Sequence, residues 1–413
     1  MMIKNLNKLI RTDGWMHSTI SNRRKVTATP QFHPKKVLVL SKITRYEFEK
    51  RRHPNLSEEQ LTDALAKRGS DYKGLLYHHD IHTKCLNLVT ETLRRHNIET
   101  RVVQRSNYKE ECIDWADAIL STGGDGTFLL GASRIQDSNK LIIGINSDPS
   151  RSEGYLCLPA KYSTDFPLAM KKLLEGRFRW NLRHRVRITL TGENAFEPPL
   201  ELHDSQLTYP EYRFMDCIQE HHKAALLLPK NTDNRQVRVL PILALNEVFI
   251  GESLSSRVSY YEISIDGSLR VKQKSSGVTI CTGTGSSSWY FNINKLTQQC
   301  VQNLLNIVKQ ETGCGISVTP ELENKIRSKF NNSLYFDPGE LKMAYTIRDP
   351  VVNGTVYTSE PRGFANSIEI KSRCFNACLV IDGGLSFVFN DGATALFDMF
   401  PEDALRSVIL LED

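Results

Sequence analysis

The sequence has no long hydrophobic run. None of its apolar stretches approaches the roughly 20 residues that a membrane-spanning helix requires, although 40% of its 413 residues are hydrophobic. We therefore expect a soluble globular protein with no membrane partner. The length is sufficient for two domains of ordinary size.

The sequence also lacks paired cysteine motifs. Its nine cysteines are scattered, and none forms a Cys-x-x-Cys pair. This pattern predicts neither a disulfide framework nor a structural zinc site. Cys374 and Cys378 are the closest pair, and the apolar alternation around them favours packing in a strand over a metal role. We therefore assign no metal-binding side chain.

A basic surface is absent from most of the chain, although the net charge is +6. Residues 1–36 hold eight lysines and arginines but a single acid, Asp13, so the remainder is close to neutral. The charge distribution therefore gives no reason to expect a nucleic-acid partner.

The N-terminal stretch is basic, poor in acids and rich in hydroxyl side chains. These properties are typical of an organellar import peptide, and we predict that residues 1–34 are a mitochondrial targeting segment. The alternative is a disordered basic tail that stays attached. The prediction places the protein in the mitochondrial matrix.

The first part of the chain alternates strand-like and helix-like segments. The predicted strands are Val37–Leu40, Arg101–Val103, Ala118–Leu120 and Leu141–Ile145, and the predicted helices are His82–His96 and Phe128–Gln136. This alternation predicts a doubly wound, Rossmann-like α/β domain over residues 35–180, with its ligand site at the carboxyl ends of the strands. We expect the charged segment Arg45–Lys73 to be an insertion or an exposed helix.

A mostly β domain is predicted to follow over residues 181–395, because short β-rich runs are separated there by Gly, Asn, Asp and Pro turns. Residues 193–233 are polar and rich in proline, which indicates a surface insertion. The expected exceptions to the β character are helices at Asn294–Lys309 and Pro320–Lys329. Residues 396–413 are left as a C-terminal segment, and a nucleotide site is expected between the two domains.

The strongest chemical signal is the turn from Ser121 to Thr127, with the sequence Ser-Thr-Gly-Gly-Asp-Gly-Thr. Three glycines allow backbone N–H groups to approach a phosphate chain, and the acid among them can receive a proton from an attacking hydroxyl. The pattern therefore predicts phosphoryl transfer. The alternative is a tight turn whose Asp125 caps the next helix.

Two further segments accompany this turn. Leu245-Asn246-Glu247-Val248 places an amide and a carboxylate at a β run, and Thr282–Trp289 is a loop of glycines and hydroxyl side chains. Together the three segments resemble the NAD kinase family. The resemblance covers most of residues 35–395, and the forms of Asn146–Gly154 and Ile250–Arg257 look like the mitochondrial branch of the animal NAD kinases.

The resemblance implies roles for the residues of the first turn. Asp125 corresponds to the family's general base, which takes the proton of the adenosine ribose 2′-hydroxyl of NAD as that oxygen attacks the γ-phosphate of ATP. Gly123, Gly124, Gly126 and Thr127 would line the phosphates. Asn146 would lie beside the nucleotide pocket, although an asparagine that only shapes a turn explains it almost equally well.

The resemblance also implies an adenosine site. The amide of Asn246 would read the adenine edge, and the carboxylate of Glu247 would accept hydrogen bonds from ribose hydroxyls. The loop residues Thr284, Gly285, Ser286, Ser287 and Ser288 would close over NAD. The chain departs from the family pattern at Gly283, where proline is common, at Ser275–Gly277, where many members have an acid, and at Trp289, where tyrosine is common. Contacts to the nicotinamide side of NAD are therefore open.

NAD and ATP are the substrates that the resemblance implies. Mg²⁺ is expected to arrive with ATP, because no His or Cys cluster is available to anchor it. A homodimer is expected from the resemblance alone.

Two other functions remain possible from the sequence. A lipid kinase could share the glycine turn, but its Gly-Thr-Gly-Asn-Asp segment is missing and Ile143–Pro149 occupies the equivalent place. A catalytically silent protein that binds NAD or NADP could retain the pocket. The intact turn around Asp125 argues against the second alternative, and an assay would decide.

Overall fold

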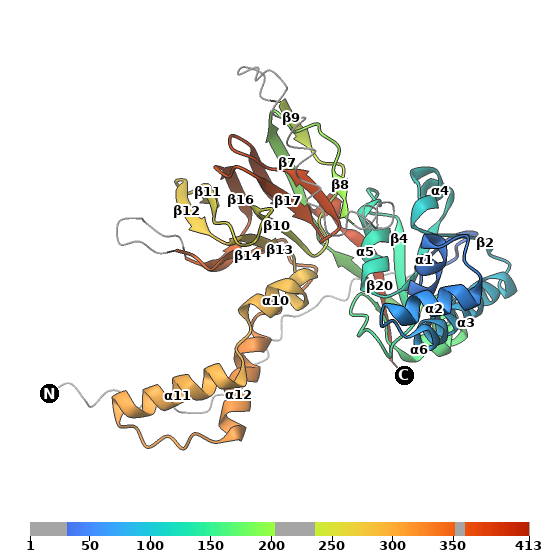
Figure 1. Cartoon of the computed structure of the whole chain (residues 1–413), viewed down its shortest axis with the longest axis horizontal. Coiled ribbons are helices and arrows are strands. Elements are labelled where there is room, and N and C mark those ends of the chain that lie inside the picture. The colour runs from blue at the N-terminus through green and yellow to red at the C-terminus, as the bar shows by residue number, and fades with distance from the viewer. Residues whose placement is uncertain (1–30, 203–235, 352–359, 413) are drawn as a thin grey trace, which may run out of the picture.

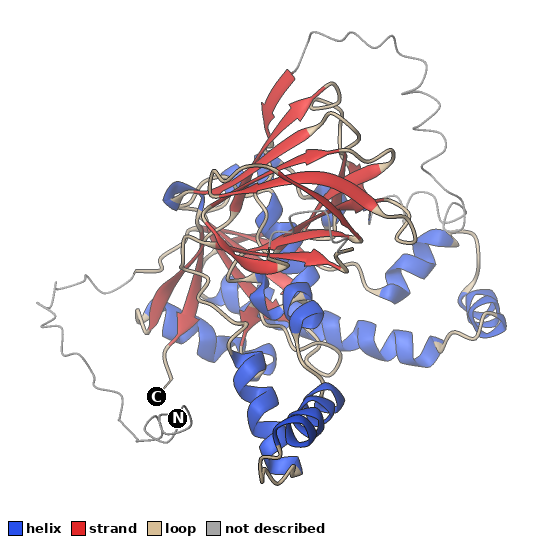
Figure 2. Ribbon diagram, turned by 90° about the vertical axis from the view of Figure 1, so that its left-hand side faces the viewer, coloured by secondary structure: helices blue, strands red, loops and turns tan. Residues whose placement is uncertain are grey.

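The structure is a computed structural model that describes residues 31–202, 236–351 and 360–412. These residues form one mixed sheet with helices on both faces and two antiparallel sheets (Figure 1). Figure 2 shows the antiparallel strands at the top of the view and most of the helices below them. An α/β part and a mostly β part, as the sequence predicts, are thereby confirmed in these broad terms.

The first sheet has the order β2-β1-β3-β4-β20-β6, with the short β5 beside β4. Its neighbouring strands pair in parallel, apart from β6, which is antiparallel to β20. The predicted strands are confirmed within a few residues. Their bounds are β1 Lys36–Ser41, β2 Glu99–Val103, β3 Ala118–Gly123, β4 Leu141–Asn146, β5 Cys157–Leu158, β6 Phe178–Arg183 and β20 Leu405–Leu410.

Alternate side chains of this sheet point into two different apolar layers. On one face Val39, Leu120 and Ile143 pack against α3 (Tyr72–Arg95) and α7 (Phe166–Leu174). On the other face Leu40, Ile119 and Ile142 pack against side chains of α4 (Glu110–Trp115) and α5 (Asp125–Ser133). Helices on both faces of a largely parallel sheet are the doubly wound arrangement.

The helix α3 begins at Tyr72, well before the predicted His82. The prediction began too late because histidines and charged residues in the first turns weaken the apolar period. The charged segment before it contains two short helices, α1 (Arg45–Arg52) and α2 (Glu58–Lys67), each with a capping box at its start. Leu61 and Leu65 of α2 are buried. A four-residue helix, α6 (Lys161–Thr164), precedes α7.

The last described strand returns to the first sheet. Leu405–Leu410 form β20, which lies between β4 and β6, and its side chains Val408 and Leu410 join the layer under α3 and α7. The sequence predicts a separate C-terminal segment at residues 396–413, but Leu405–Leu410 within it form an inner strand of the first sheet. Pairing between strands so distant in sequence leaves no local signal.

The second part is built from two antiparallel sheets that enclose a common core, with orders β15-β14-β13-β10-β17-β18-β8 and β12-β11-β16-β19-β7-β9. The bounds in the first are β8 Leu200–Glu201, β10 Glu247–Glu252, β13 Gly277–Cys281, β14 Met343–Arg348, β15 Arg362–Ala365, β17 Ala377–Ile381 and β18 Leu385–Val388. Those in the second are β7 Val186–Gly192, β9 Gln236–Val239, β11 Ser259–Ile265, β12 Val271–Ser275, β16 Ser367–Ser372 and β19 Thr394–Met399. Most of the predicted insertion at residues 193–233 lies outside the described residues.

Three helices follow β13: α10 (Trp289–Asn294), α11 (Gln298–Thr312) and α12 (Pro320–Asn332). The last two confirm the helices that the sequence predicts among the β-rich runs. Figure 1 shows α11 and α12 packed together and projecting away from the sheets. Of the helices described, none is both long enough and apolar enough to cross a bilayer.

Candidate functional site

The glycine turn joins β3 to α5 at the carboxyl edge of the first sheet. Gly123 is the last residue of β3, and Asp125 is the first residue of α5. A Cβ at Gly123 would overlap the side chain of Thr127 and lie 3.2 Å from the Cβ of Lys42. Only glycine fits there, and the turn presents bare backbone at the positive end of a helix, which is suited to an anion.

The Asp125 carboxylate faces the backbone that follows β4. Its Oδ1 accepts the N–H of Leu156 at 2.8 Å, and its Oδ2 accepts the N–H of Tyr155 at 3.1 Å. These hydrogen bonds hold the carboxylate in one orientation. A carboxylate oxygen can accept more than one hydrogen bond, so Asp125 retains the capacity to receive a proton from a substrate hydroxyl.

Asn146 ends β4 and organises the loop after it. Its Nδ2 donates to the carbonyl of Ser152 at 2.8 Å, and its Oδ1 accepts the N–H of Asp148 at 3.1 Å. Gly154, with φ of 69°, packs directly against the Asn146 side chain, so no Cβ fits there. The amide of Asn146 therefore shapes the loop, as the alternative of a turn-forming asparagine predicts.

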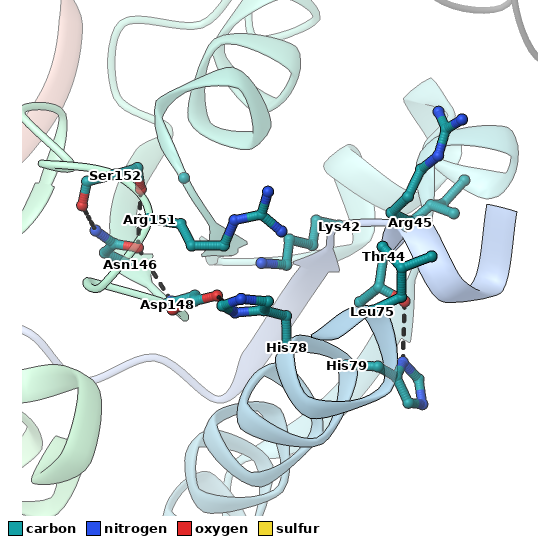
Figure 3. A pocket seen from close by; sticks show the side chains of 12 residues that line it. Lys42, Thr44, Arg45, Leu75, His78, His79, Asn146, Asp148, Arg151 and Ser152 are labelled. Carbon is teal, nitrogen blue, oxygen red and sulfur yellow. Dashed lines mark hydrogen bonds and ion pairs between the residues drawn. The ribbon is translucent and has the colours of Figure 1, made fainter. Parts of the chain in front are cut away.

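A pocket of about 230 Å³ adjoins this turn and this loop (Figure 3). It lies at the carboxyl ends of β1, β3 and β4, where doubly wound folds bind ligands. In Figure 3, Lys42 and Arg151 extend into the same space, with Arg45 at its outer edge. Its lining residues are Lys42, Ile43, Thr44, Arg45, Leu75, His78, His79, Gly124, Asn146, Asp148, Arg151 and Ser152.

Burial and the carboxylate of Asp148 both affect the pKa of Lys42 in this pocket. Burial lowers the pKa of Lys42, and the nearby Asp148 carboxylate partly offsets this effect. Burial would raise the pKa of Asp148, but hydrogen bonds from Ser150 and His78 outweigh it and lower the pKa. The His78 Nδ1 lies 2.8 Å from Asp148 Oδ2. Three cations and one acid leave the pocket attractive to a polyanion.

His82 connects the ends of two strands beneath the pocket. Its Nε2 lies 3.0 Å from Ser41 Oγ at the end of β1, and its Nδ1 lies 2.9 Å from Ser147 Oγ after β4. Burial, followed by the charge of Lys42, lowers the pKa of His82 to about 4. The ring is therefore neutral near pH 7, and it connects the two segments that carry the pocket residues Lys42 and Asp148.

A second polar cluster lies at one end of the strands β17, β10 and β13. Asp382 follows β17, and its carboxylate accepts the backbone N–H groups of Leu245, Asn246 and Glu247 at 2.9, 2.7 and 3.1 Å. Asp382 has φ of 47°, a left-handed conformation that aspartate tolerates. Asp382 therefore fixes the backbone of the Asn246–Glu247 pair.

The side chains of that pair retain unused acceptors. Asn246 Oδ1 and Glu247 Oε2 are buried and have no hydrogen-bond partner among the described residues. Burial, with a smaller contribution from the Asp382 charge, raises the pKa of Glu247 to about 8. Buried polar atoms are usually satisfied, so these two are suited to a ligand that carries hydrogen-bond donors.

The loop Thr284–Ser288 packs against the same pair. Ser288 Oγ accepts from Asn246 Nδ2 at 3.4 Å, and a Cβ at Gly285 would overlap the Asn246 carbonyl. Ser286 Oγ donates to the Gly283 carbonyl at 2.6 Å, and Ser287 Oγ donates to the Thr284 carbonyl at 3.4 Å. The hydroxyls of Ser286 and Ser287 therefore shape the loop itself. Trp289 follows, with its ring 5.1 Å from that of Phe249.

Arg183 joins the two groups of predicted site residues. It is the last residue of β6, and its Nη1 donates to Thr284 Oγ1 at 3.4 Å. Asp125 is the carboxylate with the strongest electrostatic effect on it, followed by Asp337. Arg183 thus contacts the Thr284–Ser288 loop directly, and its charge interacts with that of Asp125 in the Gly123–Thr127 turn.

Sequence reasoning did not identify the basic pocket residues or Arg183. Lys42 directly follows the first predicted strand, and Asp148 and Arg151 lie in a segment already singled out for its resemblance. Their positions in the sequence could therefore have identified Lys42, Asp148 and Arg151 as candidate site residues. Arg183 stands among several arginines of a β-rich segment, and nothing in the local sequence separates it from its neighbours.

Comparisons with known proteins give a consistent result. The chain is 46% identical over 385 residues to the human protein named "NAD kinase 2, mitochondrial", covering 92% of this chain and 85% of that protein. It is 43% identical over 412 residues to the Xenopus tropicalis protein of the same name, covering 95% and 94%. A solved structure, described as yeast NADH kinase complexed with NADH, has 12% identity and a TM-score of 0.49, covering 92% of this chain and 84% of that one. No protein-family model matches the chain.

Proposed function

The chain belongs to the NAD kinase family, and we propose that the pocket beside Gly124 and the polar cluster at Asn246 and Glu247 are the donor and acceptor halves of one kinase site. The protein is an ATP-dependent kinase of NAD that produces NADP in mitochondria, and its relatives carry the name "NAD kinase 2, mitochondrial". The observation that carries the proposed site is the position of Arg183, whose Nη1 donates to Thr284 Oγ1 of the loop and whose charge interacts with that of Asp125.

Asp125 is proposed as the residue that receives the proton. The ribose 2′-oxygen of NAD forms a bond to the γ-phosphorus of ATP, the bond from that phosphorus to the β-phosphate oxygen breaks, and the hydroxyl proton passes to the Asp125 carboxylate. The N–H groups of Tyr155 and Leu156 hold this carboxylate in place. A carboxylate is a weak base, so its contribution lies in orienting the hydroxyl and accepting the proton late.

The acceptor half is proposed to hold the adenosine of NAD. The unpartnered Asn246 Oδ1 suits the exocyclic amino group of adenine, and the unpartnered Glu247 Oε2 suits ribose hydroxyls. Thr284 and Ser288 border the same space, where Thr284 meets Arg183 and Ser288 meets Asn246. Gly285 brings the loop backbone close to the Asn246 backbone.

The donor half is proposed to hold the triphosphate of ATP in the pocket beside Gly124. Lys42, Arg45 and Arg151 offer positive charge there, and the start of α5 offers backbone N–H groups. Gly123, Gly126 and Thr127 complete this turn. Asn146 supports the pocket through its loop.

Mg²⁺ is proposed to enter with ATP. Among the described residues, no group of three or more His, Cys, Asp or Glu side chains is placed to hold a metal ion. Mg²⁺ often keeps several water ligands and binds largely through the phosphate oxygens of its substrate. Bound in this way, Mg²⁺ neutralises charge on the β- and γ-phosphates.

The domain and targeting assignments complete the proposal. We propose that residues 35–180 carry the donor half and residues 181–395 the acceptor half, with Arg183 just past the boundary. Residues 1–34, whose first 30 lie outside the described residues, are proposed as a transit peptide because of their basic, acid-poor composition. A fusion of residues 1–36 to a reporter that stayed in the cytosol would contradict this.

A homodimer is also proposed. Leu304, Ile307 and Val308 of α11 are 54%, 53% and 42% exposed, on a helix whose only buried residue is Val301. An apolar stripe on a projecting helix is expected to pack against a second copy of the chain.

The test is production of NADP by the purified full chain from NAD, ATP and Mg²⁺. Formation of NADP that depends on both substrates is the expected result. Binding of NAD without any NADP formation would instead indicate a catalytically silent binding protein.

A further inference from the structure

The side chain of Arg183 has an unusual set of contacts for a cation that lies inside the protein. It is half-buried, and its Nε is buried with no hydrogen-bond partner among the described residues. Its Nη1 donates a long hydrogen bond to Thr284 Oγ1, at 3.4 Å. A guanidinium has five N–H donors, so most of its capacity is unused.

Two nearby arginines show what a structural role looks like in the same segment. Arg185 Nε donates to the Asp403 carbonyl at 2.7 Å, and its Nη1 donates to the Ile135 carbonyl at 2.6 Å. Arg187 makes two hydrogen bonds to the Asp403 carboxylate, at 2.7 and 2.8 Å. Both hold strands and turns together. Arg183 has no such set of acceptors among the residues that the structure describes.

The charge of Arg183 is also not neutralised by direct contact. Burial lowers its pKa, and the carboxylates of Asp125 and Asp337 act in the opposite direction. Neither carboxylate forms an ion pair with it within 4.0 Å in the described part of the chain. A partly buried cation without a paired anion is suited to an anionic ligand.

The position of Arg183 indicates which anion that is. Its Nη1 contacts Thr284 of the loop assigned to NAD, and its charge interacts with that of Asp125, which is proposed to receive the hydroxyl proton. In the proposed function the phosphoryl group is transferred beside Asp125 to the NAD held by this loop. Its charge is spread over three oxygens in the transition state, and the planar fork of a guanidinium matches two of them.

Resting on the proposed function, we propose that Arg183 is a catalytic residue that holds the oxygens of the phosphoryl group during its transfer to the 2′-hydroxyl of NAD. The arginine exchanges no proton and forms no bond to phosphorus. The 2′-oxygen to phosphorus bond forms, the bond to the β-phosphate oxygen breaks, and the proton goes to Asp125. The hydrogen bond to Thr284 ties the position of Arg183 to that of the NAD loop.

The test compares Arg183→Ala, Arg183→Lys and Arg183→Gln in the full chain, with Arg179→Ala as the matched control on an exposed position of the same strand. Removing one preorganised charge donor at a transition state typically slows turnover by about 10²- to 10³-fold. We expect this loss in kcat for the Ala and Gln variants, with KM for NAD and ATP changed by less than about fivefold. The Lys variant should recover only part of the rate, because it lacks the planar fork.

A chemical rescue separates this role from a purely structural one. Added guanidinium ion should raise the rate of the Ala variant by about tenfold or more and leave Asp125→Asn unaffected. A kcat within about threefold of the parent for the Ala and Gln variants would overturn the proposal, and so would a loss that guanidinium does not restore and that follows a lowered unfolding midpoint. If the Ala variant does not fold, the Gln variant carries the same comparison. A parent chain that forms no NADP would overturn the proposed function together with this role.

Discussion

The carboxylate of Asp382 accepts the backbone N–H of Glu247 at 3.1 Å, and the two carboxyl groups have different surroundings. Asp382 also accepts the backbone N–H groups of Leu245 and Asn246, whereas Glu247 has a buried oxygen without a partner among the described residues. Burial raises the pKa of both, to about 6 for Asp382 and about 8 for Glu247. Asp382 therefore serves the backbone, and Glu247 is left for a ligand.

This pair makes stability depend on pH in a defined direction. The pKa of Glu247 is 4.5 in the unfolded chain and about 8 in the folded one, so the folded state binds the extra proton between these values. Stability should therefore fall as pH rises from about 5 to 8. Glu247→Gln should remove most of this dependence above about pH 6, the pKa of Asp382, and be more stable than the parent by roughly 1–3 kcal/mol at pH 8. Denaturant unfolding at pH 5.5 and pH 8 measures both effects. The exposed Glu59→Gln serves as control, and an equal slope in parent and Glu247→Gln would contradict the assignment.

Asp125→Asn tests the proton acceptor. The amide keeps the shape and one hydrogen-bond acceptor for the backbone of Tyr155 and Leu156, but it cannot take the proton. We expect kcat to fall by about 10²- to 10⁴-fold with little change in KM. Steady-state formation of NADP measures this, with the exposed Asp114→Asn of α4 as control. A fully active Asn variant would remove Asp125 from the mechanism.

Lys42→Ala tests the donor pocket. Its ammonium group lies in the pocket beside Gly124, where loss of a charged contact to phosphate costs about 1.5–3 kcal/mol. KM for ATP should therefore rise by about 10- to 100-fold, while KM for NAD changes little. The exposed Lys67→Ala is the matched control. An equal rise in both constants would indicate that the pocket does not hold the donor.

Gly285→Ala tests the close approach of the NAD loop to Asn246. A Cβ at this position would overlap the Asn246 carbonyl, a fixed backbone atom, so the loop must move. We expect a loss of about 1–3 kcal/mol in stability and a marked loss of NAD binding. Calorimetric titration with NAD and thermal unfolding measure these effects. Gly315→Ala, which has open space around its Cβ, should behave as the parent. Normal NAD binding by Gly285→Ala would show that this close approach is not needed to form the NAD site.

Leu304→Glu tests the homodimer. A charge in the apolar stripe of α11 should convert the dimer to a monomer, because it would be buried unpaired at the contact. Light scattering after size-exclusion chromatography measures the mass. Gln302→Glu, on an exposed polar position of the same helix, should leave the dimer intact. A parent chain that is already monomeric would disprove the dimer itself.

Local patterns in the chain were sufficient to predict much of the fold. Runs such as Val37–Leu40 and Leu141–Ile145 predicted strands because a buried parallel strand is apolar throughout. The first turns of α3 and the final strand β20 were missed. In α3 the apolar period is weak before His82, and β20 depends on neighbours β4 and β6 that are far away in sequence.

The sequence alone predicted the chemistry of the chain: the glycine turn at Asp125 indicates phosphoryl transfer, and the resemblance of the Asn246–Glu247 pair and the hydroxyl loop to the NAD kinase family implies a dinucleotide substrate. Those signals are local, since backbone reach and side-chain type are set within a few residues. Only the tertiary structure decided which of the polar side chains hold the fold together. It placed the Asn146 amide on its own loop, the Asp382 carboxylate on the backbone of Asn246 and Glu247, and Arg183 against Thr284. The backbone carbonyls that accept from Arg185 are in place only after distant strands have packed, so no local pattern could distinguish Arg183 from Arg185.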